Sequence, residues 1–188
     1  GVDLYYNPNK VTSLLSFDHI RIAQLLENAL NKKPGAKTAV ISLGCGSCQI
    51  DKVVLEHLQE QGKHDIAFFG VDSSIAMIQK AKEVLRDATF EAHLIYADFG
   101  AENFREQLKK ITGDYDLGIY LFFGKTFGNL NQGYISDVLY NTLNTEDYVL
   151  LDIGGFDTIT TNILSKLFER YVNYLENPNE ADFFLGPL

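Results

Sequence analysis

Short apolar runs alternate with amphipathic stretches along this chain, a pattern typical of a parallel sheet wrapped by helices. The runs predict strands at Thr38–Leu43, Ile66–Val71, Glu91–Ala97, Asp116–Phe123 and Tyr148–Ile153. Apolar residues at helical spacing predict helices at about Asp18–Asn31, Gln49–Gln61, Ser74–Leu85, Glu102–Lys110, Tyr134–Leu143 and Thr158–Leu175. Since strand-helix-strand crossovers are almost always right-handed, we expect a doubly wound α/β fold whose ligands bind outside the carboxyl ends of the strands.

The apolar positions also predict the buried face of the first two helices. In the first helix these residues are Ile22, Leu25, Leu26, Ala29 and Leu30, and in the second they are Ile50, Val53, Val54 and Leu58. Ser16 or Asp18 can cap the start of the first helix. Because no repeat, low-complexity tract or Pro-rich linker divides the sequence, residues 1–188 are predicted to form a single domain that includes an N-terminal helical segment, residues 1–35.

A glycine-rich turn follows the first predicted strand directly, with the sequence Gly44-Cys45-Gly46-Ser47-Cys48. Its glycines let the backbone approach a ligand closely, and the free N–H groups at the start of the next helix can bind polar or anionic ligand atoms. The dinucleotide-binding version of this turn expects a third glycine where Gln49 stands, which argues against NAD. The same turn can also serve as a plain tight connection between strand and helix.

Acidic residues end the second and third predicted strands. Asp72 precedes Ser73, and its carboxylate can accept hydrogen bonds from both hydroxyls of a ribose, although it can also cap the next helix. Asp98 and Phe99 follow the third strand, where an acid can accept from an adenine amino group and a ring can lie on the adenine face. Three successive strand ends therefore present groups suited to a nucleoside.

In their order and spacing, the turn and the two acids resemble the first motifs of the class I S-adenosylmethionine-dependent methyltransferases, over about Leu43 to Ile153. The resemblance implies a Rossmann-like sheet and S-adenosyl-L-methionine as the cofactor. It implies a cofactor-binding site made of Gly44, Cys45, Gly46, Asp72, Ser73, Asp98, Phe99, Phe123 and Gly124. In such enzymes the methyl group passes in line from a sulfonium to a nucleophile, so positioning supplies most of the catalysis.

The stretch after the fourth strand, Leu121 to Leu130, is similar to the F-x-G-S-T-I-G-N segment of the histidine-specific methyltransferases, which trimethylate the α-amino group of histidine. It departs from that segment at Lys125 and Phe127. The similarity implies that Asn129 touches the amino or carboxylate group of the acceptor. We therefore expect a small-molecule acceptor, such as a histidine-like amine, or a protein side chain. No general base is evident, and the nearest polar candidates are Asn129, Asp152 and Asp157.

Two other classes of protein stay open. Without an evident general base, the domain can be a non-catalytic sensor that binds S-adenosylmethionine, or the partner of another subunit. Cys45 and Cys48 form a C-x-x-C between strand and helix, the setting of a thioredoxin-like redox pair, and a helix N-terminus can lower the pKa of such a thiol. However, no proline precedes a later central strand, and the 4 histidines show no ligand spacing that would predict a metal site.

Charge and hydropathy limit the kinds of partner that the sequence predicts. The chain carries 16 Lys and Arg against 25 Asp and Glu, a net charge of −9, which argues against binding to a nucleic-acid backbone. Its longest apolar run, Leu117 to Phe123, is far shorter than the roughly 20 residues of a membrane-spanning helix. The first residues show no basic start followed by an apolar stretch, so no secretory signal is visible and we expect a cytoplasmic location.

The end of the sequence predicts an incomplete sheet. Methyltransferases of this class normally add two further strands after the fifth strand and its helix, but only Ala181 to Leu188 follow the polar break around Pro178. The fifth strand would then be an exposed edge, with unpaired N–H and C=O groups that favour association. We therefore expect either further C-terminal sequence or a partner chain on that edge, such as a second copy in a homo-oligomer.

Overall fold

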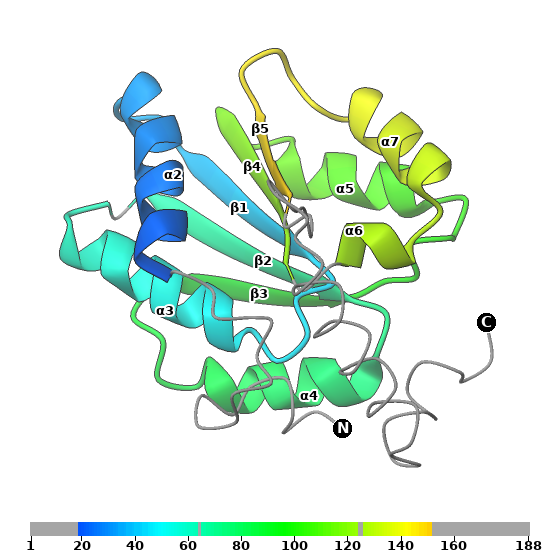
Figure 1. The fold of residues 1–188 in the computed structure, drawn as a ribbon, viewed down its shortest axis with the longest axis horizontal. Coiled ribbons are helices and arrows are strands. Elements are labelled where there is room, and N and C mark those ends of the chain that lie inside the picture. Colours follow the sequence, from blue (N-terminus) through cyan, green and yellow to red (C-terminus); the bar gives the residue numbers. More distant parts are fainter. Residues whose placement is uncertain (1–18, 64, 124–125, 152–188) are drawn as a thin grey trace, which may run out of the picture. The chain divides into compact units, whose positions relative to one another are not determined.

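A sheet of five parallel strands, in the order β3-β2-β1-β4-β5, organises the part of the chain that the structure describes (Figure 1). This computed structural model describes residues 19–63, 65–123 and 126–151. The strands are β1 (Thr38–Leu43), β2 (Ile66–Asp72), β3 (Glu91–Tyr96), β4 (Leu117–Phe122) and β5 (Tyr148–Leu151). All four strand pairings are parallel. The predicted doubly wound, Rossmann-like sheet is therefore confirmed.

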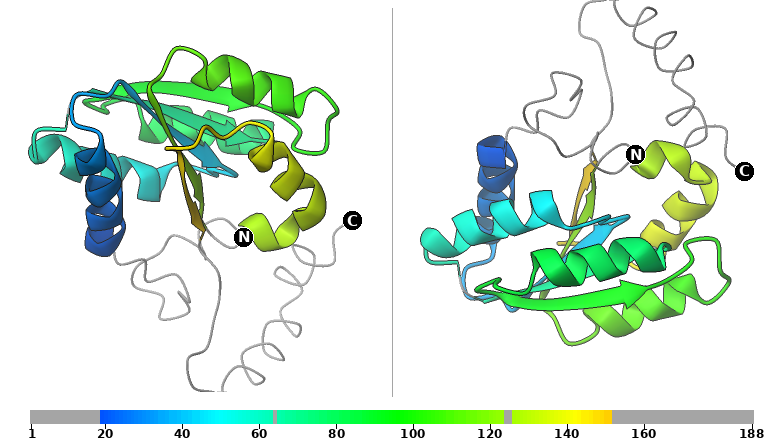
Figure 2. Two further views of the ribbon diagram at one scale, coloured as in Figure 1. Left: turned by 90° about the horizontal axis from the view of Figure 1, so that it is seen from above. Right: turned by 90° about the horizontal axis from the view of Figure 1, so that it is seen from below.

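Helices cover both faces of this sheet, as Figure 2 shows. One face packs against α2 (His19–Lys32), α3 (Gln49–Glu60) and α4 (Ile75–Val84), and the other against α5 (Phe104–Thr112) and α7 (Gln132–Tyr140). Successive strand residues point to opposite faces, so Val40 packs in the first of these cores while Ala39 and Ile41 pack in the second. β1 lies between these two cores, and each of its residues is buried.

The helix boundaries differ from the predicted ones by a few residues. The helix expected from Glu102 begins at Phe104, and the helix expected from Tyr134 begins at Gln132, where the side chain of Asn131 accepts a hydrogen bond from the Tyr134 N–H and caps it. A short helix, α6 (Thr126–Asn129), was not predicted. The expected helix at Thr158–Leu175, both candidate caps of the first helix and the last two residues of the fifth predicted strand lie outside the described residues.

Two predicted core residues are wrong, because Leu25 and Val53 are each 46% exposed. A helix rotates about 100° per residue, so two consecutive residues cannot both point to the centre of the buried face. In α2 that centre falls on Leu26, one residue after Leu25. In α3 the buried stripe consists of Asp51, Val54, Leu55 and Leu58, and Val53 lies beside it.

The two outer strands of the sheet are β3 and β5, each with a single strand neighbour among the described residues. On β5 that neighbour is β4, and Val149 is 36% exposed. Residues 152–188 lie outside the described part, so the expected partner on the β5 edge stays a prediction. None of the helices in residues 19–151 that the structure describes is long and apolar enough to cross a membrane.

Candidate functional site

The carboxyl ends of the strands bring the predicted site residues to one edge of the sheet (Figure 1). Gly44 follows β1, Asp72 ends β2, Asp98 follows β3 and Phe123 follows β4. The register places Leu43 beside Val71 and Asp72 beside Tyr96, so these ends are level with one another. Because the chain leaves β1 for β2 and β3 and later returns to β4 on the other side of β1, this edge is also the topological switch point where α/β sheets bind ligands.

The glycine-rich turn is pinned to the end of β2 through its backbone. The N–H groups of Gly44 and Cys45 both donate to the carbonyl of Val71, at 2.8 and 3.1 Å. Gly44 and Gly46 have φ angles of +74° and +56°, in the left-handed region that favours glycine. The shape of the turn therefore favours glycine at these two positions, whatever the turn binds, although Cys48 has a similar φ of +58°.

Asp72 is the residue that joins the turn to the second strand end. Its Oδ2 accepts a hydrogen bond from the N–H of Gly46 at 2.9 Å, and its Oδ1 accepts one from the N–H of Ser74 at 2.8 Å. The residue that caps α4 is Ser74, whose hydroxyl accepts from the N–H of Met77 at 3.4 Å. Asp72 is half-buried, and each of its oxygens keeps a lone pair for a further donor. Ser73 beside it is exposed.

The third strand end presents an exposed acid and a buried ring. Asp98 is exposed, and its Oδ1 accepts a hydrogen bond from the N–H of Gly100 at 2.8 Å. Phe99 is only 7% exposed and packs edge-on against Phe104, with 5.2 Å between the ring centroids. The acid therefore faces solvent at the site edge, while the ring contributes to the core beneath it.

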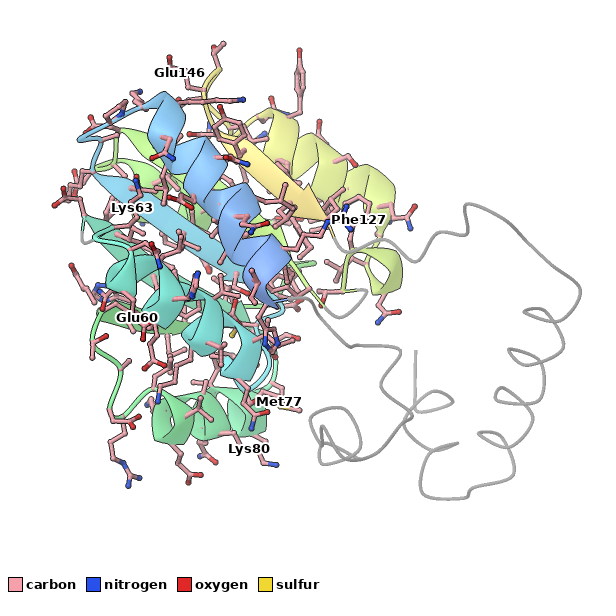
Figure 3. The ribbon with its side chains drawn as sticks, turned by 60° about the vertical axis from the view of Figure 1, so that its left-hand side comes forward. Glu60, Lys63, Met77, Lys80, Phe127 and Glu146 are labelled. Atoms are coloured by element: carbon pink, nitrogen blue, oxygen red, sulfur yellow. The ribbon has the colours of Figure 1, made fainter. Side chains whose placement is uncertain are left out.

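The fourth strand end continues through Phe123 into α6. Phe123 is 8% exposed, and Gly124, the other predicted cofactor residue here, lies outside the described residues. Thr126 begins α6, and its Oγ1 donates a hydrogen bond to the carbonyl of Phe123 at 2.7 Å. Asn129 ends α6 and is exposed. In Figure 3, Phe127 of α6 and Met77 in the first turn of α4 both lie toward the edge formed by the carboxyl ends of the strands, whereas Glu146 lies at the opposite edge.

A buried polar cluster under the start of α3 was missed by the sequence analysis. Asp51 is 3% exposed, and burial raises the pKa of its carboxyl to about 6, although hydrogen bonds from the Ser42 hydroxyl and its own backbone N–H lower it part of the way. In the described part of the chain, Asp51 Oδ1 and Ser47 Oγ are buried without a hydrogen-bond partner. The signal was present in the sequence, because position 51 lies three and four residues before the buried Val54 and Leu55.

The two cysteines of the turn are packed beneath it. Cys45 is 7% and Cys48 is 1% exposed, and a side chain on Gly70 of β2 would come within 3.1 Å of either sulfur. A hydrogen bond with Cys45, burial and the charge of Asp51 raise the pKa of the Cys48 thiol. For Cys48 these effects oppose the lowering of the pKa that a helix N-terminus can cause. Because the thiolate is the reactive form, the raised pKa also disfavours redox chemistry.

Comparison with known proteins agrees with this geometry. A family model described as a histidine-specific, S-adenosylmethionine-dependent methyltransferase matches residues 2–164. No curated protein matches the chain.

Solved structures show the same fold. An S-adenosylmethionine-dependent methyltransferase from Clostridium acetobutylicum is 15% identical, with 74% of this chain and 52% of that chain covered and a TM-score of 0.51. A protein from Listeria monocytogenes, assigned to the class I S-adenosylmethionine-dependent methyltransferases, is 14% identical, with 81% of this chain and 50% of that chain covered and a TM-score of 0.50. The chain thus spans about half the length of these two structures.

Proposed function

The chain belongs to the family of histidine-specific, S-adenosylmethionine-dependent methyltransferases, and from this premise we propose that it transfers the methyl group of S-adenosylmethionine to the amine of a small, histidine-like amino acid. The observation that carries the donor half of this proposal is the position of Asp72. Its two oxygens are held by the N–H groups of Gly46 and Ser74, at 2.9 and 2.8 Å. The carboxylate is thereby fixed beside the glycine-rich turn, with lone pairs left for two ribose hydroxyls.

The residues at this edge fit the cofactor. Glycine at position 46 adds no side chain to the turn, so that a ligand can approach its backbone there. The N-cap residue of α3, Cys48, makes no side-chain hydrogen bond to the first turn of the helix, so the N–H groups of Gln49 and Ile50 can meet polar ligand atoms. Asp98, exposed at the next strand end, is suited to accept from an adenine amino group.

The bound cofactor supplies an activated methyl group on a sulfonium, and the chain supplies position. Asp72 and Asp98 would hold the ribose and the adenine of the nucleoside, and would thereby orient it at the sheet edge. Asn129, on the acceptor side, has an amide that can both donate to a carboxylate and accept from an amine. Bringing the two reactants into line in this way is a large part of what catalysis of a methyl transfer requires.

A small amino acid is favoured over a protein side chain as the acceptor by the segment after β4. The family model extends over this segment, and the description of that model names histidine. Asn129 is a single exposed amide at the end of a four-residue helix, which suits recognition of the polar end of a small molecule. No described residue is assigned as a general base, and Asp152 and Asp157 lie outside the described part.

Two measurements test the proposal. Calorimetry with S-adenosylhomocysteine should show binding to the wild type, and absence of binding would overturn the assignment of the donor site. Methyl transfer from S-adenosylmethionine is then measured with L-histidine, with a panel of other amino-acid amines and with histidine-containing peptides. Turnover of the free amino acid alone supports the proposed acceptor. Turnover of the peptides alone would replace it with a protein acceptor, and binding without any turnover would favour the sensor.

A further inference from the structure

The donor turn and the acceptor segment meet at one side chain, Thr126. A Cβ atom on Gly44 would overlap the methyl group of Thr126 and would lie 2.8 Å from its hydroxyl oxygen. Only a glycine can occupy position 44 while Thr126 stays where it is. The first residue of α6 therefore lies directly on the first glycine of the donor turn.

The orientation of Thr126 is fixed by hydrogen bonds to the end of β4. Its Oγ1 donates to the carbonyl of Phe123 at 2.7 Å, and its backbone N–H donates to the same carbonyl at 3.3 Å. With the hydroxyl directed toward β4, the methyl group is directed onto Gly44. Each of the two ends of this short side chain thus contacts a different part of the site.

The helix that carries Thr126 is anchored to the core by an aromatic contact. The ring of Phe127 packs edge-on against Phe122 of β4, with 5.5 Å between the centroids. Phe127 and Leu130 both pack against the core on the α5 and α7 face of the sheet. Because Thr126 fills the space over Gly44, a displacement of Gly44 would be transmitted to α6 through this side chain.

We propose that Thr126 is a positioning residue that couples the donor turn to the acceptor segment, so that occupation of the turn orders α6 and the Asn129 that it carries. This inference rests on the proposed function, because it assumes that a methyl donor occupies the turn. Coupling between two sites is reciprocal in free energy, so a bound acceptor must in turn tighten the donor. Thr126 would touch neither reacting atom.

The test measures hydrogen exchange of the α6 amides with and without S-adenosylhomocysteine, which requires no knowledge of the acceptor. In the wild type, the ligand should slow exchange of the amides of residues 127–130 by about tenfold, within the range typical of coupled sites. Thr126→Ser keeps the hydroxyl and removes the methyl group, whereas Thr126→Val keeps the shape and removes the hydroxyl. Both substitutions should reduce that slowing to less than about twofold, while the amides of Gly46 and Ser74 stay protected by the ligand.

Thr142 provides the matched control. Its Oγ1 donates to the carbonyl of Val138 at 2.7 Å, as Thr126 does to Phe123, but it follows α7 at the opposite edge of the sheet. Thr142→Ser and Thr142→Val should leave the effect of the ligand on α6 unchanged. Ligand-induced protection of α6 that is absent in the wild type, or equal in the wild type and both Thr126 variants, would overturn the coupling. Absence of calorimetric binding to the wild type would instead overturn the proposed function.

Discussion

The two halves of the site are built differently. In the donor half, residues 38–99, the functional groups are tied to one another by backbone hydrogen bonds, from Gly44 to Val71, from Gly46 to Asp72 and from Ser74 to Asp72. In the acceptor half, residues 117–151, the predicted contact Asn129 is exposed at the end of a four-residue helix. The fifth strand there has only four residues, and none of them is fully buried.

This difference separates two requirements of a methyltransferase. The donor is the same in every turnover, so a site that is rigid before binding suits it. The entropy of ordering such a site is lost when the protein folds and does not weaken binding. An acceptor site held through few contacts can change its specificity while the hydrogen bonds within the donor half stay in place. The comparison predicts that substitutions in the donor half act on cofactor affinity, and that those in the acceptor half act on turnover.

The largest effect is expected from Asp72→Ala. Each hydrogen bond to a charged acceptor contributes roughly 1.5 to 3 kcal/mol, and about 1.4 kcal/mol is a factor of ten, so two lost ribose contacts should weaken S-adenosylhomocysteine binding by more than tenfold. Calorimetry of the two proteins measures this. The substitution also removes the acceptor of the Gly46 and Ser74 N–H groups, so a fall in affinity alone does not separate contact from folding.

Asp147→Ala is the matched control for this substitution. Asp147 likewise accepts two backbone hydrogen bonds, from Gly118 and Asn144, both at 2.7 Å, but it stands before β5 at the opposite edge of the sheet. The Asp147→Ala protein should lose about as much stability as the Asp72→Ala protein, but it should keep the wild-type affinity for S-adenosylhomocysteine. Equal affinities in the wild type and Asp72→Ala would remove Asp72 from the donor site.

The sequence predicted the donor half better than the acceptor half, for physical reasons. β1 is a run of apolar residues between Pro34-Gly35 and Gly44, and both of its predicted ends agree with the structure. α6 was missed because four residues that include Gly128 show no helical period, and its stability comes from packing of Phe127 on Phe122. Local sequence contains no information about such a contact.

Within the candidate site, too, some features could be predicted from the sequence and others could not. That Gly44, Asp72 and Asp98 reach one edge follows from the parallel direction of the strands, which the alternation of strands and helices predicted. The hydrogen bond from Gly46 to Asp72 and the contact of Thr126 with Gly44 join residues 26 or more positions apart, so only the fold brings them together. Burial of Asp51 was missed because a charged residue at a helix start is usually solvated.

A second substitution in the donor half, Asp51→Asn, should stabilise the protein at neutral pH. Burial raises the pKa of this carboxyl from 3.8 to about 6, so the folded protein favours the neutral form. The resulting loss of stability is absent below pH 3.8, grows as the pH rises and is complete above about pH 6. That shift corresponds to about 3 kcal/mol, and we expect a gain of about 2 kcal/mol because a buried amide still lacks full hydration.

Urea unfolding at pH 4 and at pH 7 measures this difference. The stability of Asp51→Asn relative to the wild type should be near zero at pH 4 and largest at pH 7. Lys52→Gln is the control, because Lys52 is the next residue of α3 and pairs with Asp87 near the surface. A wild type whose stability does not fall relative to Asp51→Asn between these two pH values would contradict the raised pKa of the buried Asp51 carboxyl.

In the acceptor half, Asn129→Ala should change the kinetics without changing the donor site. One lost neutral hydrogen bond is worth about 1 kcal/mol, so the KM of the acceptor should rise, or kcat should fall, by roughly fivefold, while the Kd of S-adenosylhomocysteine stays the same. Steady-state methyl transfer to L-histidine and calorimetry measure the two quantities. Asn103→Ala is the control, since Asn103 is also exposed and its side chain makes no capping hydrogen bond at α5. An unchanged methylation rate would exclude Asn129 from the acceptor site.

The smallest effect is expected from the two cysteines of the donor turn, although they lie closest to its glycines. Cys45→Ser and Cys48→Ser should leave the Kd of S-adenosylhomocysteine within about threefold of the wild type, because both sulfurs point down onto Gly70 and the turn binds through its backbone. Burial and the raised pKa of Cys48 also predict slow alkylation by iodoacetamide in the folded protein, with rapid alkylation of both thiols after unfolding in urea. Cys45→Ala and Cys48→Ala separate an effect of the buried hydroxyl from loss of sulfur. Thiol-disulfide exchange activity that is lost on either serine substitution would instead identify Cys45 and Cys48 as a redox pair.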